Sequence, residues 1–265
     1  MEYFLEDNNI SVKEDTEAFG FSISAGSKVT CVSKQGDFNG LKMRVPPPEF
    51  EALMLFSAFD SAARAEVIKK MVKVNKSSFD SMLEVEGSEA NHKNFFSACQ
   101  NSMASVAFSI SALESWVNKS IEVYGLKDGV PTELTLERPG KPDRKVLTSK
   151  VASDLRISIR VKLFQLVPQV FNVAPLKLHS TLRSNVSDLI DERNIVMHMQ
   201  SKLSLENKEL DRVSYAVKLF KASSFNAPDL VLKYVNYIYS KSDIQTASWV
   251  KVAESEIETI KKGLK

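Results

Sequence analysis

The amino-acid sequence predicts a mainly helical protein with a small β-containing region at its N-terminus. Apolar residues recur at every third or fourth position over long stretches after residue 90, which is typical of amphipathic helices. Glycine is scarce, with 9 in 265 residues, so few tight turns are expected. Because 43% of the residues are hydrophobic, the chain can bury a substantial core.

The first fifty residues are predicted to form short strands. Two runs alternate apolar with small or polar residues: Phe19, Phe21 and Ile23, and then Leu41, Met43 and Val45. Turns are predicted at Gly26, Gly36 and Gly40. Three prolines at 46–48 end this pattern, and a helix is predicted over residues 50–74.

Two polar stretches, "KVNKSS" and "EGSEANHK", are predicted to be connectors, and the second contains the main domain boundary. The predicted organisation is an N-terminal α+β region at residues 1–88, a helical bundle at 89–242 and a C-terminal helix at 243–265.

The strongest helical pattern begins at Phe95. Glu114 and Asn118, four residues apart, lie at the edge of its apolar stripe. The stripe spans more than seven turns and consists of Phe95, Cys99, Met103, Val106, Ile110, Leu113, Val117 and Ile121.

The later part of the chain is predicted to hold a hairpin or insertion followed by further helices. Residues 127–145 are rich in proline, glycine and charge and interrupt the helical pattern. A helix is predicted at about residues 149–171, and Pro168 is expected to bend or end it. Further helices are predicted to begin near residue 180, after a cap at Ser204 and at residue 226, and a last helix is predicted over 244–262. Val213, Val217 and Phe220 are predicted to form the buried face of the helix that Ser204 caps.

Composition argues against several classes of protein. Cys31 and Cys99 are isolated, which suits a reducing compartment, and no run of about 18 apolar residues predicts a membrane span. The acidic start does not resemble a signal peptide, so we expect a cytoplasmic protein without a membrane partner. His92 and His179 lack metal-ligand spacing, and neither a P-loop nor a GxSxG motif is present; no metal or cofactor is predicted.

One octapeptide, "DERNIVMH" at 191–198, departs from the apolar pattern. On a helical wheel Arg193 falls in the middle of the apolar stripe. Its neighbours three and four residues away are all apolar: Leu189, Ile190, Val196 and Met197. Because a buried unpaired charge costs several kcal/mol, Arg193 must find its partner on another helix, on another subunit or in a ligand.

His198 lies about 140° around the same wheel from Arg193. Asn194 and His198 are four residues apart and share a face, so Asn194 is placed to orient the imidazole. This spacing favours a composite site over a self-contained pair of residues.

The string Arg193-Asn194-Ile195-Val196-Met197-His198 resembles the RNxxxH signature of HEPN domains (higher eukaryotes and prokaryotes nucleotide-binding). The long preceding helix with "SALESWVNKSI" and the helices that follow agree with that family over residues 90–240. The resemblance implies an up-and-down four-helix bundle that forms a homodimer. Many such proteins are metal-independent endoribonucleases, often toxins or antiphage defence effectors.

Carried over by position, the resemblance makes Arg193, Asn194 and His198 the catalytic residues. Imidazole transfers protons near neutral pH, and a guanidinium stabilises charge on the scissile phosphate of an RNA such as tRNA or mRNA. Glu114 is then expected to orient Arg193. Many HEPN toxins regulated by a nucleotidyltransferase antitoxin continue as HxY, whereas Met199 and Gln200 follow here, so modification of a motif tyrosine by an antitoxin is in doubt.

The alternatives to this hypothesis are a helical bundle unrelated to HEPN domains and a HEPN domain without catalytic activity. Arg193 could simply pair with an acid such as Glu114 in a non-catalytic HEPN scaffold, or in a module that binds a nucleotide or regulatory partner. The basic stretch 138–162 is either a solvated surface or an RNA-binding surface. On the second interpretation the RNA-binding residues are Arg156, Arg160 and Lys162.

Overall fold

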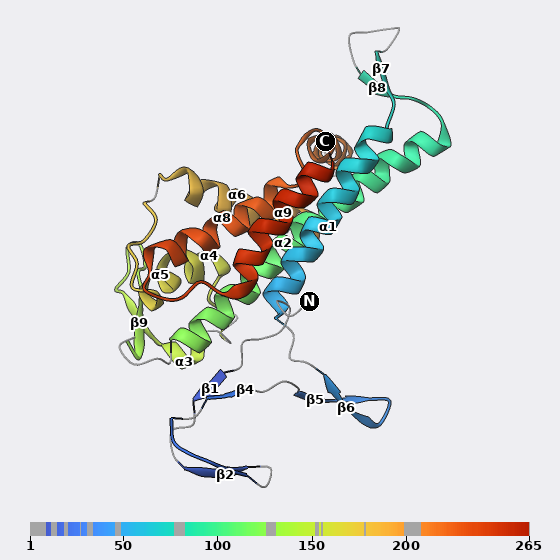
Figure 1. The fold of residues 1–265 in the computed structure, drawn as a ribbon. Coiled ribbons are helices and arrows are strands. Elements are labelled where there is room, and N and C mark those ends of the chain that lie inside the picture. The colour runs from blue at the N-terminus through green and yellow to red at the C-terminus, as the bar shows by residue number, and fades with distance from the viewer. Residues whose placement is uncertain are drawn as a thin grey trace.

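The computed structural model is mainly helical, as predicted (Figure 1). It describes residues 9–11, 15–18, 21–26, 28–30, 34–45, 49–76, 83–125, 131–151, 154, 156–177, 179–198 and 208–264. Within these residues the helices are α1 (Phe50–Met71), α2 (Glu89–Tyr124), α3 (Thr148–Val151), α4 (Ile159–Val161), the π-helix η2 (Lys162–Leu166), α5 (Val167–Val170), α6 (Thr181–His198), α7 (Lys208–Lys221), α8 (Asn226–Lys241) and α9 (Ser248–Gly263).

Helix α2 is the central element of the helical body. The hydroxyl of Ser88 caps its start by accepting a hydrogen bond from the Asn91 amide at 3.3 Å. It packs against α1, α6, α7 and α8, so its buried surface extends beyond the single predicted stripe. Besides Asn91 and Trp116, the additional buried positions carry small side chains that let neighbouring helices approach closely: Ala98, Ser102, Ser105, Ser109, Ala112 and Ser120.

The predicted domain boundary near residue 88 does not separate two cores. Leu55 and Phe59 of α1 belong to the same hydrophobic cluster as Leu113 of α2 and Val250 of α9. Helix α9 packs on both α1 and α8. A boundary at residue 88 or at residue 243 therefore divides a continuous core. The polar connectors that suggested the boundary at 88 join two antiparallel helices, α1 and α2, that pack against each other.

The N-terminal strands form antiparallel pairs that lie beside the helical body in Figure 1: β1 (Asn9–Ser11) with β4 (Lys28–Thr30), β2 (Thr16–Ala18) with β3 (Phe21–Ile23), and β5 (Lys34–Phe38) with β6 (Leu41–Val45). The alternation at 41–45 and at 21–23 was predicted, while Phe19 and residues 46–48 lie outside the described residues.

Gly36 was wrongly predicted as a turn. It lies inside β5 and pairs with Met43 of β6. The turn is made by Asn39 and Gly40, which both have positive φ, at 50° and 78°. This Asn-Gly pair suits the tight turn that follows the twist of the strands, so the turn predicted at Gly40 is confirmed.

Two further hairpins connect helices. The connector between α1 and α2 contains β7 (Val74–Lys76) and β8 (Leu83–Val85), so the helix predicted to reach Val74 ends at Met71. The insertion predicted at 127–145 contains the hairpin of β9 (Glu133–Leu136) and β10 (Arg144–Leu147).

The β9–β10 hairpin is fixed to the helical body by two glutamines. Gln169 accepts a hydrogen bond from the Thr135 amide at 2.9 Å and donates to the Thr135 carbonyl at 2.8 Å. Gln165 accepts from the Glu137 amide at 3.0 Å. The two glutamines are four residues apart on the helix, and the backbone groups that they bind are two residues apart along the strand. Their hydrogen bonds therefore pair the backbone groups on the edge of β9 that does not face β10.

The helix predicted over 149–171 is broken. Helix α3 ends at Val151, and a continuous helical segment resumes only at Ile159. Its middle is the π-helix η2, immediately before α5 with Pro168 in its first turn. Proline has no amide hydrogen, and its ring clashes with the carbonyl four residues earlier, so a widened turn accommodates Pro168 where a straight α-helix does not.

Helix α6 begins within one residue of the prediction, and α8 begins at Asn226 as predicted. The predicted buried face of α7 is wrong at Val217, which is 38% exposed, whereas Tyr215 and Leu219 are buried. Ser204 lies outside the described residues.

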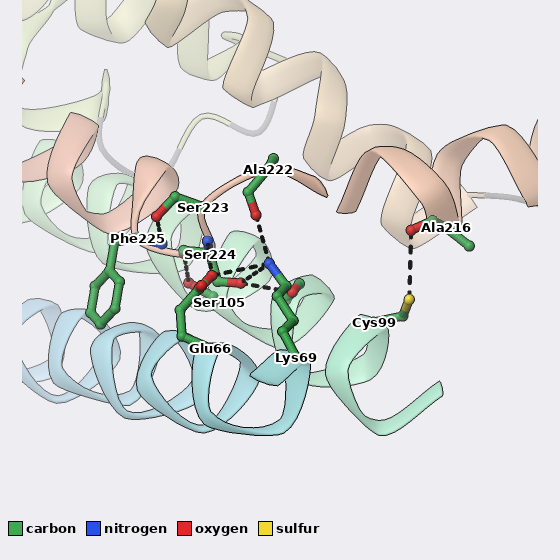
Figure 2. A network of polar contacts seen from close by, with 10 residues as sticks. Glu66, Lys69, Cys99, Ser105, Ala216, Ala222, Ser223, Ser224 and Phe225 are labelled. Carbon is green, nitrogen blue, oxygen red and sulfur yellow. Dashed lines mark hydrogen bonds and ion pairs between the residues drawn. The ribbon is translucent and has the colours of Figure 1, made fainter. Parts of the chain in front are cut away.

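A partly buried polar network holds the loop between α7 and α8 against α1 and α2 (Figure 2). Lys69 donates to Glu66 at 3.0 Å, to the Ala222 carbonyl at 2.6 Å and to Ser224 Oγ at 2.8 Å. Glu66 also accepts from the Ser224 amide at 2.7 Å, and Ser105 donates to the Ser224 carbonyl at 3.0 Å. Both Lys69 and Glu66 are thus bonded from several sides, and the network serves to fix this loop.

No helix among the described residues combines the length and apolarity needed to cross a bilayer.

We predict that Gly125→Ala destabilises the protein. Gly125 ends α2, and a Cβ there would overlap the Thr148 side chain and the Ile121 carbonyl. Relieving such overlap in a packed region costs about 1–3 kcal/mol. Chemical denaturation should show this loss, while the control Gly87→Ala, whose Cβ would meet open space, should change stability little. Equal stabilities of the two variants would contradict the packing described at Gly125.

Candidate functional site

Helix α6 places Arg193 where its buried face reaches the surface. Val186, Leu189 and Ile190 line that face and are at most 4% exposed. Arg193 continues the same stripe, three residues after Ile190, and its side chain is 31% exposed. The arginine therefore lies at the rim of the core, with its guanidinium accessible to solvent.

The partner of Arg193 comes from another helix, as its apolar surroundings on α6 required. Its Nη2 atom is 3.9 Å from Oε2 of Glu114 on α2, whose side chain is 35% exposed. Its Nη1 atom donates to the side-chain oxygen of Asn194 at 3.3 Å. Both contacts are long, and a guanidinium has five N–H donors, so this geometry leaves donors for an anion.

Asn194 is exposed beside Arg193, and His198 is the last residue of α6. Their backbone positions, four apart on one helix, keep them on a common face as predicted. The side chain of His198 lies outside the described residues, so its predicted hydrogen bond to Asn194 stays a prediction.

Lys162 is more deeply buried than Arg193 and lies against α2. It is 5% exposed and is the first residue of η2. Its ammonium donates to Asn118 of α2 at 2.9 Å, one turn from Glu114. Burial lowers the pKa of Lys162, while Asp154 and Glu114 oppose that shift. In this position Lys162 does not present its charge to a surface ligand, which counts against the predicted contact with RNA.

Arg156 and Arg160 lie nearer the surface, but each is paired with a carboxylate. Arg156 donates to both oxygens of Asp154 at 3.0 Å, and these bonds hold the pKa of Asp154 at about 2. Arg160 donates to the Ser187 carbonyl at 2.9 Å and lies 2.5 Å from Asp191. Their role in RNA binding stays a prediction, with part of their charge neutralised locally.

Glu114, Arg193, Asn194, Asn118 and Lys162 are brought together at the junction of α2, α6 and η2. The sequence pattern placed Glu114 and Asn118 on one edge of α2, but the pairing of Asn118 with Lys162 was missed. The only signal of this pairing in the sequence was the four-residue spacing that puts Asn118 on the same edge of α2 as Glu114. The position of Lys162 could not be predicted, because the π-helix that contains it was not predicted.

Within the described residues, His, Cys, Asp and Glu side chains form no group of three that could bind a metal ion. Comparison with protein-family models, with curated proteins and with solved structures gave no match to this chain.

We predict that Glu114 and Arg193 are only weakly coupled in folding. Both side chains are about one-third exposed and their closest atoms are 3.9 Å apart, and such pairs usually contribute less than about 1 kcal/mol. Glu114→Gln, Arg193→Gln and the double variant form a double-mutant cycle, measured by chemical denaturation. A coupling of several kcal/mol would show instead that Arg193 is a structural residue.

Proposed function

We propose that this protein is a metal-independent endoribonuclease of HEPN type, acting at a composite site in a homodimer. The observation that carries the proposal is the position of Arg193. It extends a buried stripe, yet its guanidinium is accessible and only loosely held by Glu114. Asn194 and His198 follow in the spacing of the RNxxxH motif.

The proposed reaction uses the 2′-hydroxyl of the RNA as nucleophile. His198 takes part in proton transfer as this oxygen attacks phosphorus and the bond to the 5′-oxygen breaks. Arg193 binds the phosphate oxygens on which negative charge develops. Asn194 positions these groups, and Glu114 orients the guanidinium from behind.

The bundle required by this proposal consists of α2, the segment 159–170, α6 and α8. Helix α2 packs on α6 and α8, and α6 also packs on α8. Tyr234 of α8 donates to the Leu163 carbonyl at 2.6 Å, which joins α8 to the 159–170 segment. These contacts support a four-helix unit.

Ile195 supports a dimer interface at the motif. Its side chain is 47% exposed although it lies between Asn194 and Val196. An apolar side chain beside an accessible arginine suits the contact region between two copies, where two motifs would meet. Two copies would also relieve the geometric problem that Arg193 and His198 face different directions on one helix.

The biological role we propose is a toxin or antiphage effector that cuts tRNA or mRNA, under the control of an antitoxin or other regulatory protein. This role rests on the motif resemblance alone.

The catalytic proposal predicts cleavage of purified RNA in EDTA. Arg193→Ala and His198→Ala should each lower the rate by at least about 100-fold, since each removes one charge-stabilising or proton-transfer group. Arg64→Ala on α1 and His92→Ala at the start of α2 are matched controls, because both residues are exposed and lie outside the motif. Full activity of both motif variants, with the folding of each confirmed by circular dichroism, would refute the proposal.

A non-catalytic scaffold is the second candidate, and the contact between Arg193 and Glu114 favours it. In a scaffold this pair would join α6 to α2 and leave no task for His198. It predicts that the wild-type chain cleaves no RNA and that Arg193→Gln unfolds the protein or disrupts its binding to a partner protein or nucleotide.

The dimer can be tested without RNA. Ile195→Asp places a charge on the proposed interface and should convert a dimer into a folded monomer, because burying that carboxylate costs several kcal/mol. Light scattering coupled to size-exclusion chromatography measures the mass, and Val67→Asp, at another exposed apolar position on α1, is the control. A wild-type chain that is monomeric at assay concentrations would contradict the composite site.

A further inference from the structure

A second cluster of charged side chains lies where α1 begins. Glu49, directly before α1, and Glu51, in its first turn, are 6% and 3% exposed. Lys119 of α2 reaches both: its Nζ atom is 2.6 Å from Glu49 Oε2 and 3.4 Å from Glu51 Oε1. The Ser115 hydroxyl, also on α2, lies 3.5 Å from Glu51 Oε2. Two buried carboxyl groups thus converge on one ammonium group.

Such an arrangement favours retention of a proton. The pKa of Glu49 is raised from 4.5 to about 7, first by burial and then by the adjacent Glu51, while Lys119 opposes the shift. Tyr239 of α8 also faces this cluster, since it interacts electrostatically with Glu51. Near neutral pH Glu49 therefore passes between its protonated and its ionised form.

The position of the cluster gives this proton a structural consequence. The Glu49 carbonyl accepts the first hydrogen bond of α1, from the Leu53 amide at 3.0 Å. In Figure 1 the chain passes from the N-terminal strands into the helical body at this point. Ser115 and Lys119 directly follow Glu114 and Asn118 on α2, so the cluster and the α6 site use neighbouring positions of one helix.

We propose that Glu49, Glu51 and Lys119 form a pH-dependent latch that holds the first turn of α1 against α2. The latch is closed when Glu49 is protonated, because a neutral carboxyl group can donate a hydrogen bond to Glu51 while Lys119 neutralises the remaining carboxylate. It loosens when Glu49 releases its proton to solvent, because two buried carboxylates then repel each other. This regulatory device does not depend on ribonuclease activity.

The test compares the pH dependence of stability in the wild-type chain and in Glu49→Gln. The folded chain keeps a proton that the unfolded chain releases above pH 4.5, so this stabilisation is complete below 4.5 and is lost as pH rises through about 7. Between pH 6 and pH 8 the wild-type folding equilibrium constant should fall about tenfold relative to that of Glu49→Gln. Taking the ratio between variants cancels the contribution of the histidines.

Hydrogen exchange then locates the change, because the amides of residues 50–55 should lose protection between pH 6 and pH 8 in the wild-type chain and keep it in Glu49→Gln. Glu122→Gln, at an exposed position on α2, should behave as wild type. Lys119→Met should move the wild-type transition to higher pH, because it removes the opposing positive charge. Parallel profiles for wild type and Glu49→Gln, or loss of protection elsewhere than the start of α1, would overturn the proposal.

Discussion

The structure depends on the burial of α2 by helices on several sides. A helix packed by α1, α6, α7 and α8 has little surface for polar groups, and unpaired polar groups in such positions destabilise the fold. Its turn at 114–119 nevertheless carries four of them, and each contacts another element: Glu114 with Arg193, Ser115 with Glu51, Asn118 with Lys162 and Lys119 with Glu49. These contacts position the α6 site and the Glu49–Glu51–Lys119 cluster.

The long helices were predictable because burial on one face imposes a regular apolar period. That period identified both α2, whose start it placed six residues late at Phe95, and α6, whose start it placed within one residue. It failed where a local constraint overrides it, as in the helix predicted over 149–171, which is interrupted after Val151 and contains a π-helix just before Pro168. The sequence pattern also suggested a domain boundary at residue 88 within what is one core. A polar connector between two domains has the same composition as one between two helices of a single core.

The candidate site was predictable only in part. An arginine within an apolar stripe must have a partner elsewhere, and this reasoning led to Glu114. No local pattern could show that Lys162 is buried against Asn118, because that contact joins segments 44 residues apart. The same holds for Glu49 and Lys119, which are separated by 70 residues and meet only through the antiparallel packing of α1 and α2.

The chemistry of the RNA ends tests the central claim most directly. If the accessible guanidinium of Arg193 assists attack by the 2′-hydroxyl, cleavage must leave a 2′,3′-cyclic phosphate on one fragment and a 5′-hydroxyl on the other. Mass spectrometry of a defined RNA incubated with the wild-type chain in EDTA should show these ends, and they should disappear with Arg193→Ala. Fragments with 3′-hydroxyl and 5′-phosphate ends, or an RNA left intact by a folded wild-type dimer, would contradict the account.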